Sequence, residues 1–171
     1  EISERFDLPV LFRVTTRVCH SKSLVEFGER EERTVTPYAR NIPKFVCTPA
    51  NAKRHRPMLE EKLERLAEYA ETSPLNRMEI KGGKVGVITS SIAYQYAKEA
   101  FPEDTSFLKL GFTWPLPMRL IRAFAEQVET LFVVEELDPF LEEQIKAAGI
   151  SCIGKDVVPN MYELNPEVVR E

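Results

Sequence analysis

The chain has 171 residues, enough for one ordinary domain or for a small domain with a substantial arm. Its residues are 43% apolar and 29% charged, and its net charge is −4, so we expect no nucleic-acid partner and no membrane partner. No apolar run approaches the roughly 20 residues of a membrane-spanning helix, and no signal-peptide pattern occurs, so the sequence predicts a cytoplasmic protein.

The three cysteines, Cys19, Cys47 and Cys152, are odd in number and widely separated. They form no CxxC pair, which argues against a zinc or iron–sulfur site within this chain and against a disulfide scaffold. We expect three reduced structural thiols and no metal bound by this segment. The first residue, Glu1, is not a methionine, so we also expect the chain to be a segment of something longer.

The first 28 residues are predicted to form an N-terminal arm, outside the α/β domain. Residues 2–8 suit the last turns of a helix that Pro9 stops. Val10–Val14 follows as a strand candidate of high β propensity. It has no sheet of its own nearby in the sequence, so we expect it to pair with another segment, which could lie outside this chain. This strand ends in a polar and basic turn over 15–21, and open α/β sheets present their ligand-binding loops in this way.

Residues 29–78 predict an extended connector followed by a helix. A charge run covers Glu29–Arg33, and prolines exclude regular helix in the first part of this region. In Pro49–Ala70 apolar residues recur on one helical face, and Pro57 marks either the helix start or a kink. The basic patch Lys53–Arg56 could bind an anionic cofactor tail or could be a solvated surface of the linker.

From about Glu79 onward, short apolar runs alternate with helical spacing. The runs that predict strands are Val85–Ile88, Ser106–Phe112, Leu131–Val134 and Ile150–Ile153. Helices are predicted between them, over 92–100, 118–128 and 138–148, and again from Asn165. This alternation predicts a doubly wound, mostly parallel α/β sheet with helices on both faces.

Hydroxyl and acidic residues follow the predicted strands. The hydroxyls of residues 89–91 predict an N-cap for the next helix or an anion site at its N-terminus, and Asp138 predicts another cap. No GxGxxG, GxxxxGK[ST] or GxSxG motif follows a strand, so neither a dinucleotide site, a P-loop nor a serine-hydrolase site is predicted. Glu135 and Glu136 are adjacent on a strand and point to opposite faces, so we expect one of them to cap or to pair rather than to share a substrate.

Five stretches of the chain together resemble one family. They are PVLFRVTTRVCHSKSLVE (9–26), TPANAKRHRPML (48–59), VGVITSSIAYQYAKEA (85–100), LKLGFTWPLP (108–117) and VVEELDPFLEEQI (133–145). They resemble the alpha subunit of indolepyruvate:ferredoxin oxidoreductase, a thiamine-diphosphate-dependent 2-oxoacid oxidoreductase. The resemblance implies that residues 1–28 are the tail of a thiamine-pyrimidine domain, and that residues 79–171 form a domain like the carboxy-terminal domain of transketolase.

The resemblance also implies an activity for the complete enzyme. Members of the family oxidatively decarboxylate aryl pyruvates such as indolepyruvate with coenzyme A, and they pass electrons through [4Fe–4S] clusters to ferredoxin. This chain lacks the family's pyrophosphate-binding domain with its GDG…N metal motif, and it lacks the Cys-rich cluster-binding tail. We therefore expect the segment alone to bind no thiamine diphosphate, Mg or cluster and to be inactive. It would serve as a structural module between the remaining domains of its subunit and a second, beta subunit.

The residues expected near substrate or cofactor are Thr15, Thr16, Arg17 and His20, on the turn that ends the predicted strand, and no catalytic residue is assigned. Arg17 could pair with a carboxylate or with a coenzyme A phosphate through charge-assisted hydrogen bonds, or it could hold an interdomain hinge. The sequence leaves open a different function, an independent small-ligand-binding or regulatory α/β domain that shares only the fold.

Overall fold

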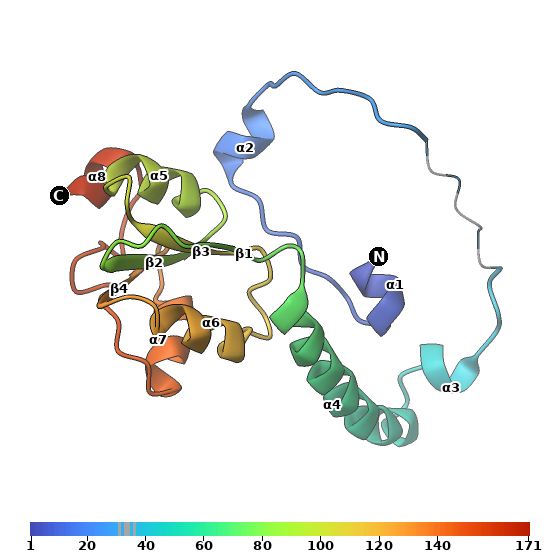
Figure 1. The fold of residues 1–171 in the computed structure, drawn as a ribbon. Helices are drawn as coiled ribbons and strands as arrows, with labels where there is room; N and C mark the ends of the chain where they lie inside the picture. Colours follow the sequence, from blue (N-terminus) through green and yellow to red (C-terminus); the bar gives the residue numbers. More distant parts are fainter. Residues whose placement is uncertain (31, 33–34, 36) are drawn as a thin grey trace. The chain divides into compact units, whose positions relative to one another are not determined.

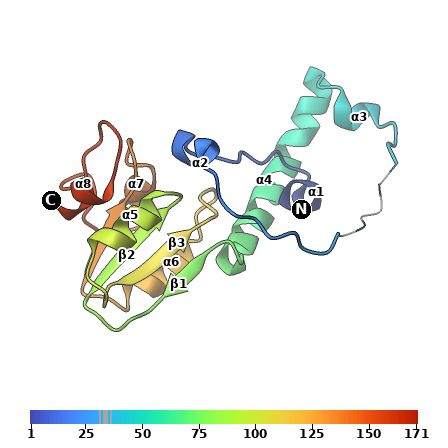
Figure 2. The same ribbon diagram turned by 90° about the horizontal axis from the view of Figure 1, so that it is seen from above.

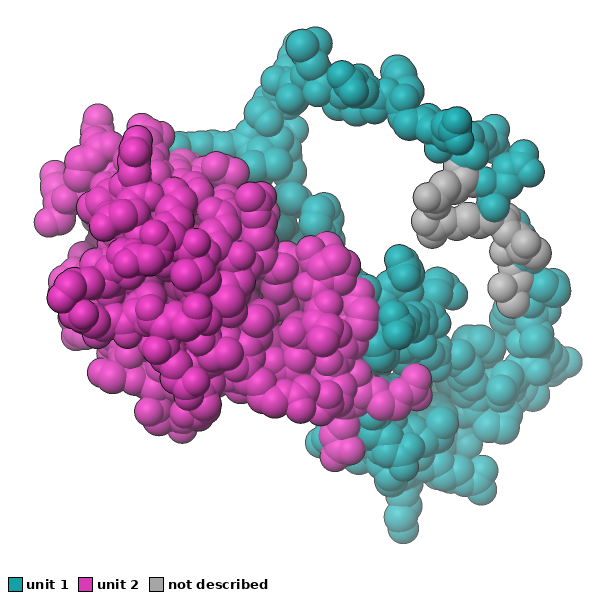
Figure 3. Space-filling model, in the orientation of Figure 1, with its two compact units in different colours: residues 1–63 teal, residues 64–171 magenta. Residues whose placement is uncertain are grey.

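The computed structural model of the chain describes residues 1–30, 32, 35 and 37–171. The described chain forms two compact units, residues 1–63 (unit 1) and residues 64–171 (unit 2), which Figure 3 colours separately. Part of the predicted charge run Glu29–Arg33, and Thr36 of the predicted connector, lie outside the described residues. The three-part division expected from the sequence, 1–28, 29–78 and 79–171, stays a prediction.

Unit 2 is built on a four-stranded sheet. Its strands are β1 (Arg77–Glu79), β2 (Val85–Ser90), β3 (Ser106–Leu110) and β4 (Thr130–Val134). The order across the sheet is β1-β3-β2-β4, with β2 parallel to both of its neighbours and β1 antiparallel to β3. Parallel neighbours need a crossover between them, so a helix follows each parallel strand.

Helices cover both faces of this sheet (Figure 1 and Figure 2). On one face lie α5 (Ala93–Ala100) and α8 (Pro166–Arg170), and on the other lie α6 (Met118–Ala125) and α7 (Phe140–Ala147). The doubly wound, mostly parallel α/β fold predicted from the sequence is therefore confirmed.

The alternation of side chains along the strands fills both faces with apolar groups. Val87 and Phe107 pack on the α5 side, whereas Ile88 and Leu108 pack on the side of α6 and α7. Each of these four side chains is at most 2% exposed. Gly86 belongs to the same packing, because a Cβ built there would lie 2.8 Å from a methyl group of Val128 and would force that side chain to shift.

The end of α7 and the start of α8 lie where the sequence predicts them. Gly149 follows Ala148, the C-cap residue of α7, and has a φ of 77°, the left-handed conformation that glycine adopts at helix ends. Asn165 caps α8 by accepting a hydrogen bond from the backbone N–H of Val168 at 3.0 Å, and Pro166 begins the helix.

The predicted strand Ile150–Ile153 is shorter than expected. It contributes a single parallel bridge, between Ile153 and Phe132 of β4. The backbone of Ile153 donates to Leu131 O at 2.9 Å and accepts from Val133 N at 2.8 Å. Only this one residue reaches hydrogen-bonding register, so the segment borders the sheet without extending it as a full strand.

The described part of unit 1 contains three short helices, the first part of a long one, and extended chain between them. The short helices are α1 (Ile2–Phe6), α2 (Thr16–His20) and α3 (Ile42–Phe45), and the long helix is α4 (Pro49–Thr72). The helix predicted over Pro49–Ala70 is confirmed, with Leu66 and Ala70 buried on its apolar side. Pro57 lies in the interior of α4, so it does not start the helix.

An ion cluster joins three helices of unit 1. Asp7, just after α1, has its two carboxylate oxygens 2.6 Å from Lys44 Nζ on α3 and 2.8 Å from Lys62 Nζ on α4. The hydrogen bonds from Lys44 and then Lys62 lower the pKa of Asp7 to about 2. The carboxylate therefore stays charged down to acidic pH and holds both ammonium groups.

Candidate functional site

Three of the four residues expected near substrate or cofactor lie on α2, and Thr15 immediately precedes this helix. Thr15 has extended backbone, and its carbonyl accepts a hydrogen bond from Cys19 N at 3.1 Å. Arg17 and His20 are three residues apart, which puts them on the same side of the helical turn. Both are exposed, as is Thr16. The structure thus gathers a guanidinium and an imidazole on one side of a short helix.

The segment predicted as a strand just before α2 is extended but unpaired. Val10–Val14 pairs with no other strand in the part of the chain that the structure describes, and Leu11 and Phe12 are 95% and 82% exposed. A strand is stable only when its backbone groups pair with a neighbour, and the partner expected for this one lies outside this chain, so the strand stays a prediction. The predicted turn over 15–21 is instead the helix α2, which ends where Ser21 Oγ donates to Val18 O at 2.9 Å.

The chemistry available around α2 is that of anion recognition. Arg17 offers a planar set of N–H donors, and His20 offers a further ring donor or acceptor. The Thr15 hydroxyl oxygen is withdrawn from solvent and has no hydrogen-bond partner among the described residues. A carboxylate or phosphate could accept charge-assisted hydrogen bonds from such a group of side chains.

The basic patch Lys53–Arg56 lies on the first half of α4. Its lysine and both arginines are exposed, whereas His55 is half-buried. Arg56 forms an ion pair with Glu60, one turn further along the helix. No ion pair is recorded between Lys53 or Arg54 and any described residue.

The carboxyl ends of β2 and β4 are the second place where polar side chains gather, and open α/β sheets bind ligands at such ends. The hydroxyl cap predicted for α5 is wrong, because the N-cap position is Ile92 and no side chain caps the helix. An N-cap residue needs extended backbone, but Ser91 has a φ of 53°. Thr89 is completely buried, and its hydroxyl has no hydrogen-bond partner among the described residues.

Glu135 provides the cap of α7. Its carboxylate accepts hydrogen bonds from the backbone N–H groups of Leu141 at 2.8 Å and Glu142 at 3.0 Å. The cap predicted at Asp138 is wrong, since the N-cap position is Pro139 and no side chain caps from there. Burial raises the pKa of Glu135, although the two backbone hydrogen bonds act in the opposite direction.

The neighbouring carboxylate serves a different contact. Glu136 accepts a hydrogen bond from Leu164 N at 3.3 Å. Glu135 is buried and Glu136 is half-buried, each with its own backbone partner. The expectation that one of the pair would cap a helix, and that the two would not share a substrate, therefore agrees with the structure.

A carboxylate from α4 caps α6, and no pattern in the sequence predicted it. Glu71, near the end of α4, accepts hydrogen bonds from Arg119 N at 3.0 Å and from Leu120 N at 2.8 Å. These N–H groups belong to the first turn of α6, where a negative charge is favourable. Glu71 and Glu135 together show that the carboxylates around the sheet are used to fix helix ends.

No sequence pattern predicted the cluster of titratable side chains around Glu79. Glu79 accepts hydrogen bonds from Tyr94 Oη at 2.5 Å and Lys98 Nζ at 2.7 Å, and Arg77 Nε lies 2.9 Å away. Burial alone would raise the pKa of Glu79, but the hydrogen bonds from Lys98 and Tyr94 lower it. The cluster ties the edge strand β1 to α5, so we assign it a structural role.

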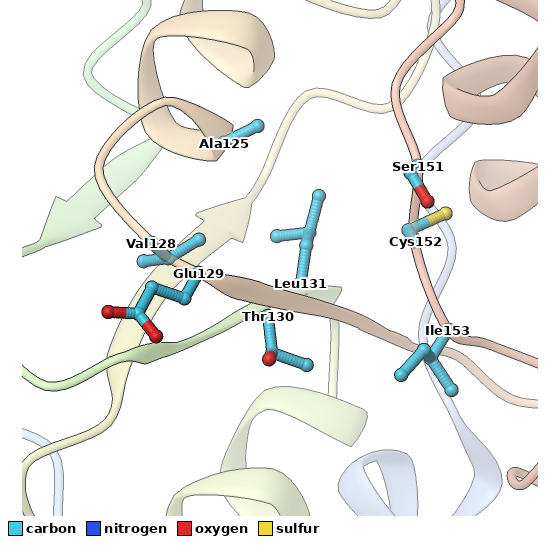
Figure 4. Close-up of a pocket in the computed structure, with 8 residues that line it drawn as sticks. All are labelled: Ala125, Val128, Glu129, Thr130, Leu131, Ser151, Cys152 and Ile153. Atoms are coloured by element: carbon cyan, nitrogen blue, oxygen red, sulfur yellow. The ribbon is translucent and has the colours of Figure 1, made fainter.

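A hollow of about 220 Å³ opens at the amino end of β4 (Figure 4). It is lined by Ala125, Val128, Glu129, Thr130, Leu131, Ser151, Cys152 and Ile153. The one charged lining residue, Glu129, is 3.0 Å from Lys84 Nζ. The hollow lies at the opposite end of β4 from the edge where α/β sheets bind ligands, and we assign it no chemistry.

Neither a metal cluster nor a membrane helix is found in the described ranges 1–30, 32, 35 and 37–171. No group of three or more His, Cys, Asp or Glu side chains gathers there in a way that could hold a metal ion. No helix in those ranges is both long and apolar enough to cross a membrane. Cys19, Cys47 and Cys152 are free thiols, and burial raises the pKa of Cys152.

Comparison with known proteins gives matches along the chain. Residues 95–157 match the family described as the indolepyruvate oxidoreductase domain. Subunit IorA of indolepyruvate oxidoreductase from Methanothermobacter marburgensis is 38% identical over 99% of this chain. The subunits of the same name from Thermococcus kodakarensis and Archaeoglobus fulgidus are each 36% identical over 96% of this chain. The chain spans 28–30% of the length of these relatives.

A solved structure shares the fold. It is a 2-oxoglutarate:ferredoxin oxidoreductase from Magnetococcus marinus with 2-oxoglutarate, coenzyme A and succinyl-CoA bound. The similarity has a TM-score of 0.53 and covers 72% of this chain and 23% of that chain. The two sequences are 19% identical, so this similarity concerns the fold alone.

Proposed function

Since the chain resembles subunit IorA of indolepyruvate oxidoreductase along nearly its whole length, we propose that it is a segment of such a subunit in a 2-oxoacid:ferredoxin oxidoreductase. The observation that carries the proposal is the identity of 36–38% over 96–99% of this chain. The chain spans at most 30% of these relatives, so the activity of the complete protein is part of the proposal.

In this proposal the complete enzyme is cytoplasmic and oxidatively decarboxylates an aryl pyruvate, such as indolepyruvate, to an acyl-CoA. Coenzyme A accepts the acyl group, carbon dioxide leaves, and ferredoxin takes up the electrons. Thiamine diphosphate with Mg would supply the decarboxylation chemistry, and [4Fe–4S] clusters would carry electrons. We place these groups outside this segment, in the remaining domains of the subunit and in a beta subunit, and no residue of this chain is assigned to hold them.

The chain's own contribution divides between its two units. Unit 2 acts as a scaffold, and the use of Glu71 and Glu135 as helix caps supports this role. Residues 15–20 of unit 1 lie near the substrate or a cofactor of the complete enzyme. The exposed Arg17 and His20, on one side of α2, support this role because they offer donors for a carboxylate or phosphate.

The test of this function uses the complete gene expressed with its beta subunit. We expect ferredoxin reduction that requires both indolepyruvate and coenzyme A, and no turnover by the 171-residue segment alone. Turnover by the segment alone would contradict its structural role. A complete protein that binds small ligands but oxidises no 2-oxoacid would favour the independent regulatory domain instead.

A further inference from the structure

A row of four side chains crosses the sheet of unit 2 near the carboxyl ends of its parallel strands. The row is Arg77 of β1, Lys109 of β3, Thr89 of β2 and Val134 of β4, each in register with the next. Residues directly opposite one another in a sheet share a face, and Val134 packs in the core on the α5 side. The four side chains therefore lie on the face that α5 covers (Figure 1).

Two cations are neighbours in this row. Arg77 and Lys109 are directly opposite each other, and like charges in that position are destabilising. Glu79 offsets part of this charge, because Arg77 Nε is 2.9 Å from one of its carboxylate oxygens and Lys98 Nζ is 2.7 Å from the other. Lys109 Nζ lies 5.3 Å from the ring centroid of Tyr94, and no ion pair is recorded between Lys109 and any described residue. Three cations thus share one carboxylate, which leaves a surplus of two positive charges.

The first turn of α5 adds hydrogen-bond donors on the same face. No side chain caps α5, and no hydrogen bond is recorded from the backbone N–H of Ala93 or Tyr94 to any described residue. The helices α6 and α7 differ, because Glu71 and Glu135 accept from their first N–H groups. Free N–H groups at a helix N-terminus favour a negatively charged group there. Since the ring of Tyr94 contacts Lys109, these N–H groups and the ammonium group are neighbours.

The hydroxyl of Thr89 is an independent sign of a missing acceptor or donor. Thr89 is completely buried, and its Oγ1 has no hydrogen-bond partner among the described residues. It lies next to Lys109 in the row and four residues before Ala93, on the side of the sheet where α5 begins. Buried polar groups are normally hydrogen-bonded, so this hydroxyl indicates a group that the described chain does not supply.

The carboxylate that follows β4 is engaged elsewhere. Glu136 is across β2 from Lys109, and it accepts a hydrogen bond from Leu164 N at 3.3 Å. Lys155 Nζ donates to the backbone carbonyl of the adjacent Glu135 at 2.5 Å, so a cation offsets this acidic end of the sheet. The surplus positive charge is therefore on the side of β1 and β3.

We propose that unit 2 binds a phosphate group on this face, either as inorganic phosphate or as part of a small phosphate monoester. Arg77, Lys109 and the first N–H groups of α5 hold it, and the hydroxyl of Thr89 is a further donor. A phosphate monoester carries a charge of about −1.5 to −2 at neutral pH, which matches the two surplus positive charges better than a carboxylate does. Glu79 keeps its structural role, and the inference does not depend on the proposed enzymatic function.

The first test is an NMR titration of the backbone amides of the 171-residue chain at constant ionic strength. Inorganic phosphate and phenyl phosphate are added separately, and sodium chloride is the control. We expect the N–H signals of Ala93 and Tyr94 to shift downfield and to saturate with phosphate but not with chloride. Saturation by phenyl phosphate would assign the site to a phosphate-bearing small molecule, and saturation by inorganic phosphate alone would assign it to the free ion. No saturable shift with either, or an equal shift with chloride, would overturn the proposal.

Neutral substitutions identify the cations. Lys109→Gln should weaken phosphate affinity by about tenfold or more through the loss of a charge-assisted hydrogen bond, and Arg77→Gln, at a side chain that is 70% exposed, should do the same. Lys84→Gln is the matched control, because it removes an exposed cation just before the amino end of β2 and should leave affinity within about twofold. An unchanged affinity in Lys109→Gln, or an equal loss in Lys84→Gln, would overturn the site.

The last variant separates binding from folding. Thr89→Val should weaken phosphate affinity by about threefold to tenfold, because one neutral donor is lost, while the phosphate-free chain becomes more stable. A residue with a merely structural role would not change affinity and stability in opposite directions. Affinity equal to that of the unmodified chain would overturn the placement of the phosphate beside Thr89.

Discussion

The two units of the chain use the same apolar residue types in different ways. In unit 2, Val87, Ile88 and Phe107 are buried because parallel strands and crossover helices supply partners on both faces of the sheet. In unit 1, Leu24 and Phe27 are fully exposed. Apolar character alone therefore does not produce a core. A core forms only where the chain also provides the element that each apolar face packs against.

The largest expected difference in the free energy of unfolding is between two phenylalanine substitutions, one in each unit. Phe124 on α6 is completely buried, so Phe124→Ala should lower the free energy of unfolding by about 3–5 kcal/mol through lost burial and a cavity. Phe27 in unit 1 is fully exposed, so Phe27→Ala should change it by about 0.5 kcal/mol or less. Urea unfolding followed by Trp114 fluorescence measures both variants. A large loss from Phe27→Ala would show that unit 1 packs as unit 2 does.

The same contrast explains what the sequence could predict. Local patterns in Val85–Ile88 and Leu131–Val134 were sufficient for the sheet, because each run is apolar enough to be buried on both faces. The segment Val10–Val14 forms no strand within the described residues, because strand formation depends on a partner and its expected partner lies outside this chain. The cap predicted at Asp138 was wrong, and no cap was predicted for α6, where the tertiary fold brings in Glu71 from 48 residues away.

The prediction about Glu135 tests whether its capping of α7 stabilises unit 2. Glu135→Ala should lower the free energy of unfolding by about 1–3 kcal/mol, because two buried N–H groups of α7 lose their acceptor. Glu136→Ala is the matched neighbour and should lower it by about 1 kcal/mol or less, since its one hydrogen bond is longer, at 3.3 Å. Equal losses from the two variants would mean that the Glu135 cap stabilises the fold no more than the single hydrogen bond of Glu136 does.

The pH dependence of Glu135 has a definite sign. Burial raises its folded pKa above the ordinary 4.5, so the folded state keeps this proton to higher pH than the unfolded state does. The stabilising contribution is therefore full below pH 4.5 and declines as pH rises through the raised pKa. Glu135→Gln is uncharged at every pH and should flatten this part of the stability profile, measured by urea unfolding at a series of pH values.

Removal of the buried hydroxyl of Thr89 should have a smaller effect on the free energy of unfolding, in the opposite direction. Thr89→Val keeps the shape and removes a buried polar group without a partner, so it should raise the free energy of unfolding by about 1 kcal/mol. Ser106→Ala is the contrasting variant, because the Ser106 hydroxyl accepts a hydrogen bond from Lys81 N at 3.1 Å. It should lower the free energy of unfolding by a similar amount. A loss in both variants would mean that the Thr89 hydroxyl has a partner in solution.

The smallest effect concerns the ion cluster of unit 1. The pKa of Asp7 falls from 3.8 to about 2 in the folded chain, so its stabilising contribution is full above pH 3.8 and is lost as pH falls toward 2. The effect is small because the carboxylate is half-exposed and screened by water. NMR titration of the Asp7 carboxyl carbon measures the pKa directly. A midpoint near 3.8 would show that Lys44 and Lys62 do not lower the pKa of Asp7.

The most direct test of the account asks whether α2 lies at the reacting centre of a larger enzyme. In the complete protein with its beta subunit, Arg17→Ala should lower kcat/KM for indolepyruvate by about tenfold to a hundredfold, the loss of a charge-assisted hydrogen bond. Arg13→Ala removes an exposed guanidinium from the same segment and should leave kcat/KM within about twofold of the unmodified enzyme. An unchanged kcat/KM in Arg17→Ala, or an equal loss in Arg13→Ala, would contradict the placement of the site.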